Sequence, residues 1–294
     1  MIFARKEGKV DSFLKYLYAH LNHGKLIRMT TESETTMNKI KIIFFDIDGT
    51  LIDMQKKEIT ERTVETLRRL QEHGILLCIA TGRTPMTVPH FEGVAFDAFL
   101  TFNGSYCYNQ KEDIYANPIP AEDVKQLLAN AAAMNRPVSI ATRNRIAANG
   151  KDKDLADYFA IAKEEVVVAD DFEQVAQEEV YQMMLGCIGE ERVRLLEGVK
   201  NAKLAAWWDR AVDVIPGDSG KGIGVEQLLR YYHLDQSEAM AFGDGNNDIE
   251  MLQAVGAGVA MENASPELKA VATEICGHVA EDGVYHYCLE HGLI

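Results

Sequence analysis

The sequence predicts an α/β protein, with a doubly wound, Rossmann-like core domain around a parallel sheet and an inserted α+β cap domain. Short apolar runs alternate with helical patterns at both ends of the chain, and this alternation is typical of a parallel sheet. Residues 119–210 break the rhythm with paired short strands and helices. The 294 residues exceed one average domain without reaching two large ones, which favours one core with a sizeable insertion.

The first part of the core is expected at residues 38–118. Three apolar runs, each followed by a turn, predict buried strands: KIIFFD (41–46), ILLCIA (75–80) and DAFLTFNG (97–104). A helix is expected at residues 61–72, and Gly74 ends it. A further short helix is expected after the second strand, where an N-terminus near Thr81 would aim backbone N–H groups at a bound anion.

The cap is expected at residues 119–210 and the second part of the core at 211–294. The cap pattern begins with a helix at 121–134 and a pair of short strands at 138–142 and 145–149. Two strand-like runs, KLAAWWD and AVDVIP, close the insertion. The alternating rhythm then returns with these elements: a helix at 220–231, a strand at 238–244, a helix from Asn247 and a short strand near Gly258.

Residues 1–37 form an N-terminal extension in this interpretation. Apolar residues recur at helical spacing within residues 1–29, and the polar linker TTESETTMNK follows them. The segment is either a docking or dimerising helix or a simple appendage. A self-sufficient domain can begin at Met37, which favours the appendage.

Composition excludes several classes of partner. The formal net charge of −15 argues against nucleic acid, since a duplex-binding surface needs many cationic side chains, and acidic membrane surfaces are disfavoured in the same way. No apolar run approaches the ~20 residues that span a bilayer. The five cysteines are odd in number and contain no C-x-x-C motif, which favours buried thiols in a reducing, cytoplasmic compartment.

Polar side chains follow four of the predicted core strands. They are Asp46, Thr81, Asn103 and Asp244. In open α/β sheets ligands bind beyond the carboxyl ends of the strands, so these side chains are expected to face one crevice.

The DIDGT segment places Asp46 at the tip of the first strand and Asp48 two residues later. Two aspartates this close suit a nucleophile that attacks phosphorus and an acid that protonates the departing oxygen. An Asp-rich turn or a calcium loop is the alternative. The EF-hand pattern fails, because Gly49 stands two positions too early and Lys57 occupies the place of the bidentate glutamate.

The GDGNND segment adds oxygen ligands at another strand end. Its Asp244, Asn247 and Asp248 would join Asp46 and Asp48 in a cluster without histidine or cysteine. Hard oxygen ligands of this kind indicate Mg²⁺. A bound phosphate would need a balancing positive charge, for which Lys221 is placed at the start of the predicted helix after the insertion.

Four motifs in this order resemble those of the haloacid dehalogenase-like superfamily: DIDGT, Thr81 in ATGR, Lys221 in SGKG, and GDGNND. The runs VIPGDSGKGIG, AFGDGNNDIEML, GVAMENASPELKAVA and EDGV extend the likeness to the Cof-type sugar phosphatases with a type IIB cap. The resemblance covers roughly residues 38–294, and residues 1–37 lie outside it.

The resemblance implies a role for each matched residue. Asp46 would be the nucleophile, and Asp48 would first protonate the leaving alcohol and later activate water. Mg²⁺ would be held by the Asp46 carboxylate, the Asp48 carbonyl and Asp244, with Asp248 supporting the metal shell. Three residues would bind the phosphoryl oxygens: Thr81, Lys221 and Asn247.

Substrate choice would then lie with the cap and the rim of the crevice. Arg83 and Asn103 are the predicted substrate contacts, although Arg83 suits a structural salt bridge equally well. Four cap residues are weaker candidates for touching a sugar or ring: Arg143, Tyr158, Trp207 and Trp208.

The expected function is hydrolysis of a small phosphorylated metabolite, and sugar phosphates are the favoured substrates. The enzyme is expected to be a monomer or a homodimer. A phosphomutase, which returns the phosphate to its substrate, is the alternative among enzymes. A non-catalytic module that senses phosphate through Asp46 is the alternative outside them, and Asp48 argues against it, since a long-lived signal needs no general acid.

Overall fold

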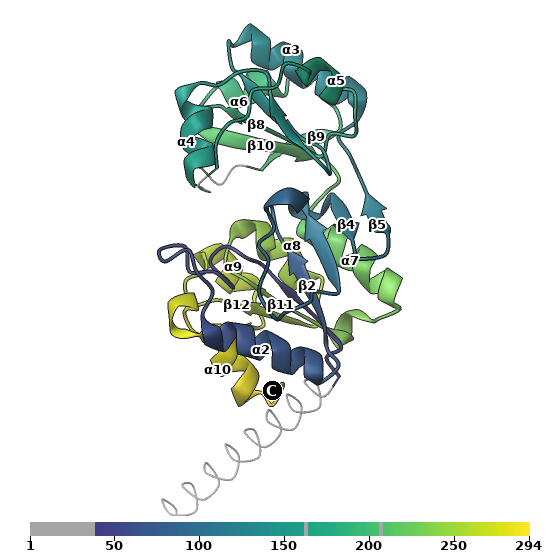
Figure 1. Cartoon of the computed structure of the whole chain (residues 1–294), viewed down its shortest axis with the longest axis vertical. Coiled ribbons are helices and arrows are strands. Elements are labelled where there is room, and N and C mark those ends of the chain that lie inside the picture. The colour runs from purple at the N-terminus through teal and green to yellow at the C-terminus, as the bar shows by residue number, and fades with distance from the viewer. Residues whose placement is uncertain (1–38, 162–163, 206–207) are drawn as a thin grey trace, which may run out of the picture.

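The computed structural model describes residues 39–161, 164–205 and 208–294. Within these residues the chain forms two sheets, which lie one above the other along the long axis of the molecule (Figure 1). The predicted helix in residues 1–29, and Trp207, fall outside the described residues.

The core sheet has eight strands in the order β13-β12-β11-β1-β2-β3-β4-β5. Their bounds are β1 (Ile42–Phe45), β2 (Leu76–Ala80), β3 (Ala98–Thr101), β4 (Tyr106–Tyr108), β5 (Asp113–Ala116), β11 (Ala239–Gly243), β12 (Ala257–Ala260) and β13 (Glu274–Ile275). The first six strands in that order pair in parallel. The predicted parallel, Rossmann-like core is therefore confirmed.

The antiparallel pair β4 and β5 was not expected from the sequence. After β3 the chain reverses through a three-residue 3₁₀ turn, η2 (Phe102–Gly104), and β4 returns beside β3. A strand of only three residues carries too little periodicity to be recognised. The pair extends the sheet at one edge, next to the end of β3.

Helices cover both faces of the core sheet (Figure 1). Their bounds are α2 (Glu61–Glu72), α7 (Lys221–Tyr232), α8 (Ile249–Gln253), α9 (Pro266–Val271) and α10 (Gly283–Glu290). Helices α2 and α10 pack together on one face, while α7 and α8 pack together on the other. The predicted helix at residues 61–72 is confirmed, and the hydroxyl of its N-cap, Thr60, accepts a hydrogen bond from the backbone N–H of Thr63.

The cap sheet has five antiparallel strands in the order β7-β6-β8-β10-β9. They are β6 (Val138–Ala141), β7 (Ile146–Ala148), β8 (Gln182–Gly186), β9 (Ala202–Ala205) and β10 (Ala211–Pro216), accompanied by α3 (Ala121–Ala133), α4 (Lys153–Ile161), α5 (Phe172–Val175) and α6 (Glu191–Leu195). This body has its own apolar core. The domain boundaries themselves stay a prediction. Strand β10 belongs to the cap sheet but begins at Ala211, just after the cap boundary expected at residue 210.

Two further expectations concern the whole described chain. All five cysteines are buried and unpaired, as small core side chains are. Among the described helices, none combines the length and the apolar character needed to cross a bilayer.

Candidate active site

Four neighbouring strands deliver the predicted site residues to one edge of the core sheet. Strands β11, β1, β2 and β3 lie side by side and run in parallel, so their carboxyl ends share that edge. The backbone N–H of Asp46 donates to Phe242 O at 3.0 Å, and the N–H of Asn103 donates to Thr81 O at 3.0 Å. The expectation that distant segments converge here agrees with this geometry.

Three carboxylates gather at this edge. Oxygens of Asp46, Asp244 and Asp248 lie within 4.8 Å of one another. Burial, together with the neighbouring carboxylates, raises the pKa of Asp46 well above its ordinary range despite the opposing effect of Lys221. Burial, followed by repulsion from Asp248, raises the pKa of Asp244 to about 7. The cluster is therefore short of positive charge, and an oxygen-only donor set of this kind fits a hard divalent cation such as Mg²⁺.

Lys221 lies inside the same cluster, although lysine is rarely buried. Its side chain is fully buried, and Nζ lies 2.6 Å from Asp46 Oδ1 and 2.5 Å from Asp248 Oδ1. Burial alone would lower the pKa of Lys221, but the two carboxylates outweigh it and raise the pKa. The ammonium group thus stays charged at the strand end that carries Asp46.

Asp248 organises the turn that follows β11. Its Oδ2 accepts from the backbone N–H groups of Asp244 and Gly245, each at 3.0 Å, while its Oδ1 accepts from Lys221. In the adjoining 3₁₀ turn, η4 (Asn246–Asp248), the Asn247 amide donates to Asn103 Oδ1 at 3.1 Å. The turn therefore links the acidic cluster to the end of β3.

Gly49 leaves the space that Asp244 occupies. A Cβ on Gly49 would lie 2.1 Å from Asp244 Oδ2, and its φ of +92° is in the region that favours glycine. Thr50 Oγ1 donates to Asp244 Oδ1 at 3.4 Å, and Asn263 Nδ2 donates to Gly49 O at 2.7 Å. Neither Thr50 nor Asn263 was among the residues predicted for the site. The signal for Asn263 was its position in the run GVAMENAS, three residues after the end of strand β12.

Asp48 is not one of the three clustered carboxylates, and it pairs with Arg83. The Arg83 guanidinium donates two bonds to the Asp48 carboxylate, from Nε at 2.7 Å and from Nη2 at 2.6 Å. A third bond runs from Nη1 to Thr87 O at 2.9 Å. Of the two alternatives for Arg83, the salt bridge is present, and it fixes the direction of the Asp48 side chain.

The segment after β2 differs from the expected short helix with its N-terminus near Thr81. It forms only a three-residue 3₁₀ turn, η1 (Pro85–Thr87). This turn begins four residues after Thr81, so this segment does not form the predicted helix that starts beside Thr81. The Thr81 hydroxyl instead accepts from the backbone N–H of Arg83 at 3.1 Å.

Comparison with known proteins identifies the family. A sequence profile of haloacid dehalogenase-like hydrolases matches residues 43–288. The chain belongs to this family. The likeness deduced from the four motifs is therefore confirmed, and the protein is an enzyme.

Relatives match this hydrolase over most of their length. YkrA of Bacillus subtilis is 34% identical over 256 residues, which cover 86% of this chain and 98% of YkrA. The 5-amino-6-(5-phospho-D-ribitylamino)uracil phosphatase YitU of Bacillus subtilis is 28% identical over 264 residues, which cover 85% and 97%. The solved structure of the sugar phosphatase BT4131, of haloacid dehalogenase subclass IIB, matches with a TM-score of 0.76 and 29% identity, covering 86% of this chain and all of that one.

The predicted cap contacts of the hydrolase have protein partners. Arg143 pairs with Asp113 of the core and with Glu179. The Tyr158 hydroxyl donates to Asp213 Oδ1 at 2.5 Å. The Trp208 ring lies under the Arg210 guanidinium, 4.6 Å from it. These contacts do not assign substrate binding to any of the candidates.

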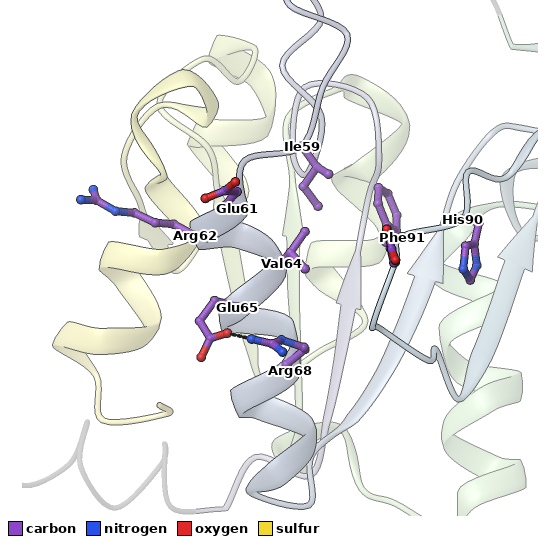
Figure 2. A pocket seen from close by; sticks show the side chains of 9 residues that line it. Ile59, Glu61, Arg62, Val64, Glu65, Arg68, His90 and Phe91 are labelled. Atoms are coloured by element: carbon purple, nitrogen blue, oxygen red, sulfur yellow. Dashed lines mark hydrogen bonds and ion pairs between the residues drawn. The ribbon is translucent and has the colours of Figure 1, made fainter.

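The hydrolase also has a cavity of about 630 Å³ beside α2, which none of the predicted site residues lines. Figure 2 shows Ile59, Val64 and Phe91 around it, with charged side chains of α2 nearby. It contains no cluster of carboxylates comparable to the one around Asp46. Among the described residues, the carboxylates that could hold a metal ion lie at the carboxyl edge of the core sheet.

Proposed function

We propose that this hydrolase is a Mg²⁺-dependent phosphatase that acts on a small phosphorylated metabolite through a phospho-aspartate on Asp46. Sugar phosphates are the favoured substrate class. One observation carries the proposal. The Asp46 carboxylate stands at a strand end, held 2.6 Å from the buried Lys221 ammonium and clustered with Asp244 and Asp248. The Asp46 carboxylate is thus placed to attack phosphorus beside positive charge that would stabilise the phosphoryl group during transfer.

The donor set suits the cation that this mechanism needs. The Asp46 and Asp244 carboxylates and the Asp48 carbonyl would hold Mg²⁺, and Asp248 would support them from behind. Gly49 keeps the Asp244 carboxylate within reach, because any Cβ would displace it. When bound, Mg²⁺ would neutralise negative charge on the transferring phosphoryl group and on the carboxylates.

Side chains of the protein would stabilise the remaining negative charge on the phosphoryl group. Lys221 would lie against one phosphoryl oxygen, while the Thr81 hydroxyl and the Asn247 amide would donate to others. The transition state of phosphoryl transfer spreads charge over three oxygens, so fixed donors around them supply much of the acceleration. Asn103 would act in this set by holding the Asn247 amide.

Bond making and proton transfer divide between Asp46 and Asp48. An Asp46 oxygen attacks phosphorus, the bond from phosphorus to the leaving oxygen breaks, and Asp48 gives that oxygen a proton. Asp48 then takes a proton from water as the water attacks the phospho-aspartate, and phosphate leaves. Arg83 orients Asp48 through its two hydrogen bonds and would contact the substrate from that position.

The substrate class is supported by the names of two relatives. BT4131 is a sugar phosphatase, and the YitU substrate carries its phosphate on a ribityl chain. Both names describe a phosphate ester on a polyhydroxy chain. A cap closed over the crevice would exclude water and select the leaving group. The cytoplasmic setting stays a prediction.

A screen of phosphorylated metabolites with Mg²⁺ tests the proposal. Hexose, pentose and polyol phosphates should release free phosphate, with kcat/KM highest for one of them. Phosphate returned to the organic substrate would establish a mutase instead. A stable phosphoprotein without multiple turnover would establish a sensing module, and activity equal in EDTA and Mg²⁺ would contradict the cation requirement.

A further inference from the structure

A buried cluster of mostly aromatic side chains joins the cap to the core. Its members come from both bodies: Phe102, Tyr106, Ala141, Leu155, Phe159, Tyr181 and Met184. Phe102 belongs to the core turn η2, and Tyr181 immediately precedes the cap strand β8. The two rings stack with centroids 5.3 Å apart and planes 12° from parallel, and both are fully buried. Phe102 directly precedes Asn103, one of the two predicted substrate contacts.

The turn that carries Phe102 has an unfavourable backbone. Phe102 and Asn103 have φ values of 51° and 53°, both in the left-handed region. Asparagine tolerates that region, but a bulky side chain such as phenylalanine adopts it only where surrounding contacts hold it. The backbone N–H of Phe102 donates to Arg83 O at 3.0 Å. The Tyr181 ring stacks on the Phe102 side chain.

Asn103 carries the position of this turn into the site. Its Oδ1 accepts from the Asn247 amide at 3.1 Å, and its backbone N–H donates to Thr81 O. A Cβ at Gly82 would lie 3.0 Å from the Asn103 amide, so that side chain fills the space above Gly82. A shift of the turn would therefore move the Asn247 amide as well.

Gly104 fixes the turn against the helix that begins with Lys221. A Cβ on Gly104 would lie 2.1 Å from Gly220 O. The turn is thus in backbone contact with the residue before Lys221. The segment Phe102–Gly104 consequently contacts the cap at its first residue and the phosphate-site segments at the next two.

We propose that Tyr181 is a positioning residue for the phosphate site. By stacking on Phe102 it keeps the left-handed turn in place, so that Asn103 holds the Asn247 amide toward the phosphoryl group. A cap side chain thereby affects phosphate binding in the core, apart from any contact between the cap and the leaving group. The inference rests on the proposed function, since it takes Asn247 as a phosphate ligand.

Inorganic phosphate is the probe that separates these effects, because it has no leaving group for the cap to touch. Its dissociation constant, measured by calorimetry on the full chain in Mg²⁺ buffer, should rise roughly fivefold in Tyr181→Leu. Tyr181→Phe keeps the ring and loses only the hydroxyl bond to Glu179, so it should bind phosphate as the unchanged protein does. Phe159→Leu weakens the same cluster from α4 and should also leave phosphate binding unchanged.

A double-mutant cycle tests whether Tyr181 affects phosphate binding through Asn103. If Tyr181 acts through Asn103, the variant Asn103→Ala should weaken phosphate binding, and adding Tyr181→Leu should weaken it little further. Additive losses, or phosphate binding that is unchanged in Tyr181→Leu, would overturn the inference. Should Tyr181→Leu fail to fold, Tyr181→Met fills more of the space and replaces it. An unaltered enzyme that neither binds phosphate nor hydrolyses esters would instead refute the proposed function.

Discussion

The carboxyl edge of the core sheet and the surface of the cap use charge in opposite ways. In the core, Lys221 is fully buried between Asp46 and Asp248, whose side chains are 9% and 1% exposed. On the cap, Arg145 and Asp171 form an equally close pair, with bonds of 2.6 Å, but their side chains are 44% and 43% exposed. Water screens the second pair and is excluded from the first.

This difference indicates which region fixes the reaction and which can vary. Buried charges need one another, so few substitutions are tolerated around Asp46. The charged cap surface tolerates change at little energetic cost. Family members that share the core chemistry can therefore differ in substrate, in line with the sugar and ribityl phosphates named for two relatives.

Loss of the buried ammonium should have the largest effect. Lys221→Met leaves Asp46 and Asp248 without their shared partner, which should lower the free energy of unfolding by about 3–5 kcal/mol in metal-free protein. kcat/KM should fall by roughly 10²–10³-fold, as when one donor to a developing charge is removed. Thermal melts and steady-state kinetics measure both. A variant with unchanged kcat/KM would show that Lys221 is only structural.

Loss of space beside Asp244 should have the next largest effect. In Gly49→Ala the new Cβ must displace the Asp244 carboxylate, so Mg²⁺ affinity should fall by about 10- to 100-fold. Gly74→Ala is the matched control, because its φ of +77° is also left-handed but nothing lies near its Cβ. Both variants should lose some stability, and only the first should lose metal affinity, measured by titration. Equal Mg²⁺ affinities would contradict this account of Gly49.

The acidic cluster should make the metal-free protein sensitive to pH. The pKa of Asp244, near 3.8 in an unfolded chain, is about 7 in the folded protein, so folding favours its protonated form. Its contribution to stability is full below about pH 4 and is lost as the pH rises through about 7. In EDTA, Asp244→Asn should lose less stability between pH 4 and 8 than the unchanged enzyme. Parallel pH curves would exclude Asp244 as the source.

The smallest effect is expected on the cap surface. Arg145→Ala removes an exposed pair that water already screens, so the melting temperature and kcat/KM should both stay unchanged within error. A clear loss of melting temperature or of kcat/KM, present at low salt and absent at high salt, would contradict the small contribution expected for exposed charges on the cap.

Much of the site could be predicted because parallel strands end at a common edge. Apolar runs predicted the strands, and polar residues at the ends of parallel strands lie at one edge of the sheet. This edge carries Asp46, Thr81, Asn103 and Asp244. The fold class followed from the same alternation.

Other features depend on tertiary contacts that no local pattern encodes. The pairing of Arg83 with Asp48 depends on how the segment after β2 turns back, and the short η1 turn replaced the expected helix. The hairpin of β4 and β5 is too short to show a period. The stacking of Tyr181 on Phe102 joins residues of two bodies, one of them with a backbone conformation that its residue type disfavours.

The central claim is that Asp46 is the nucleophile, and trapping its phosphorylated form tests it most directly. Enzyme mixed with the best radiolabelled substrate from the screen and quenched in acid should carry label on the peptide containing Asp46. Asp46→Asn should fold, bind Mg²⁺ poorly, carry no label and show no turnover. Label on another residue, or appreciable hydrolysis by Asp46→Asn, would contradict the covalent mechanism.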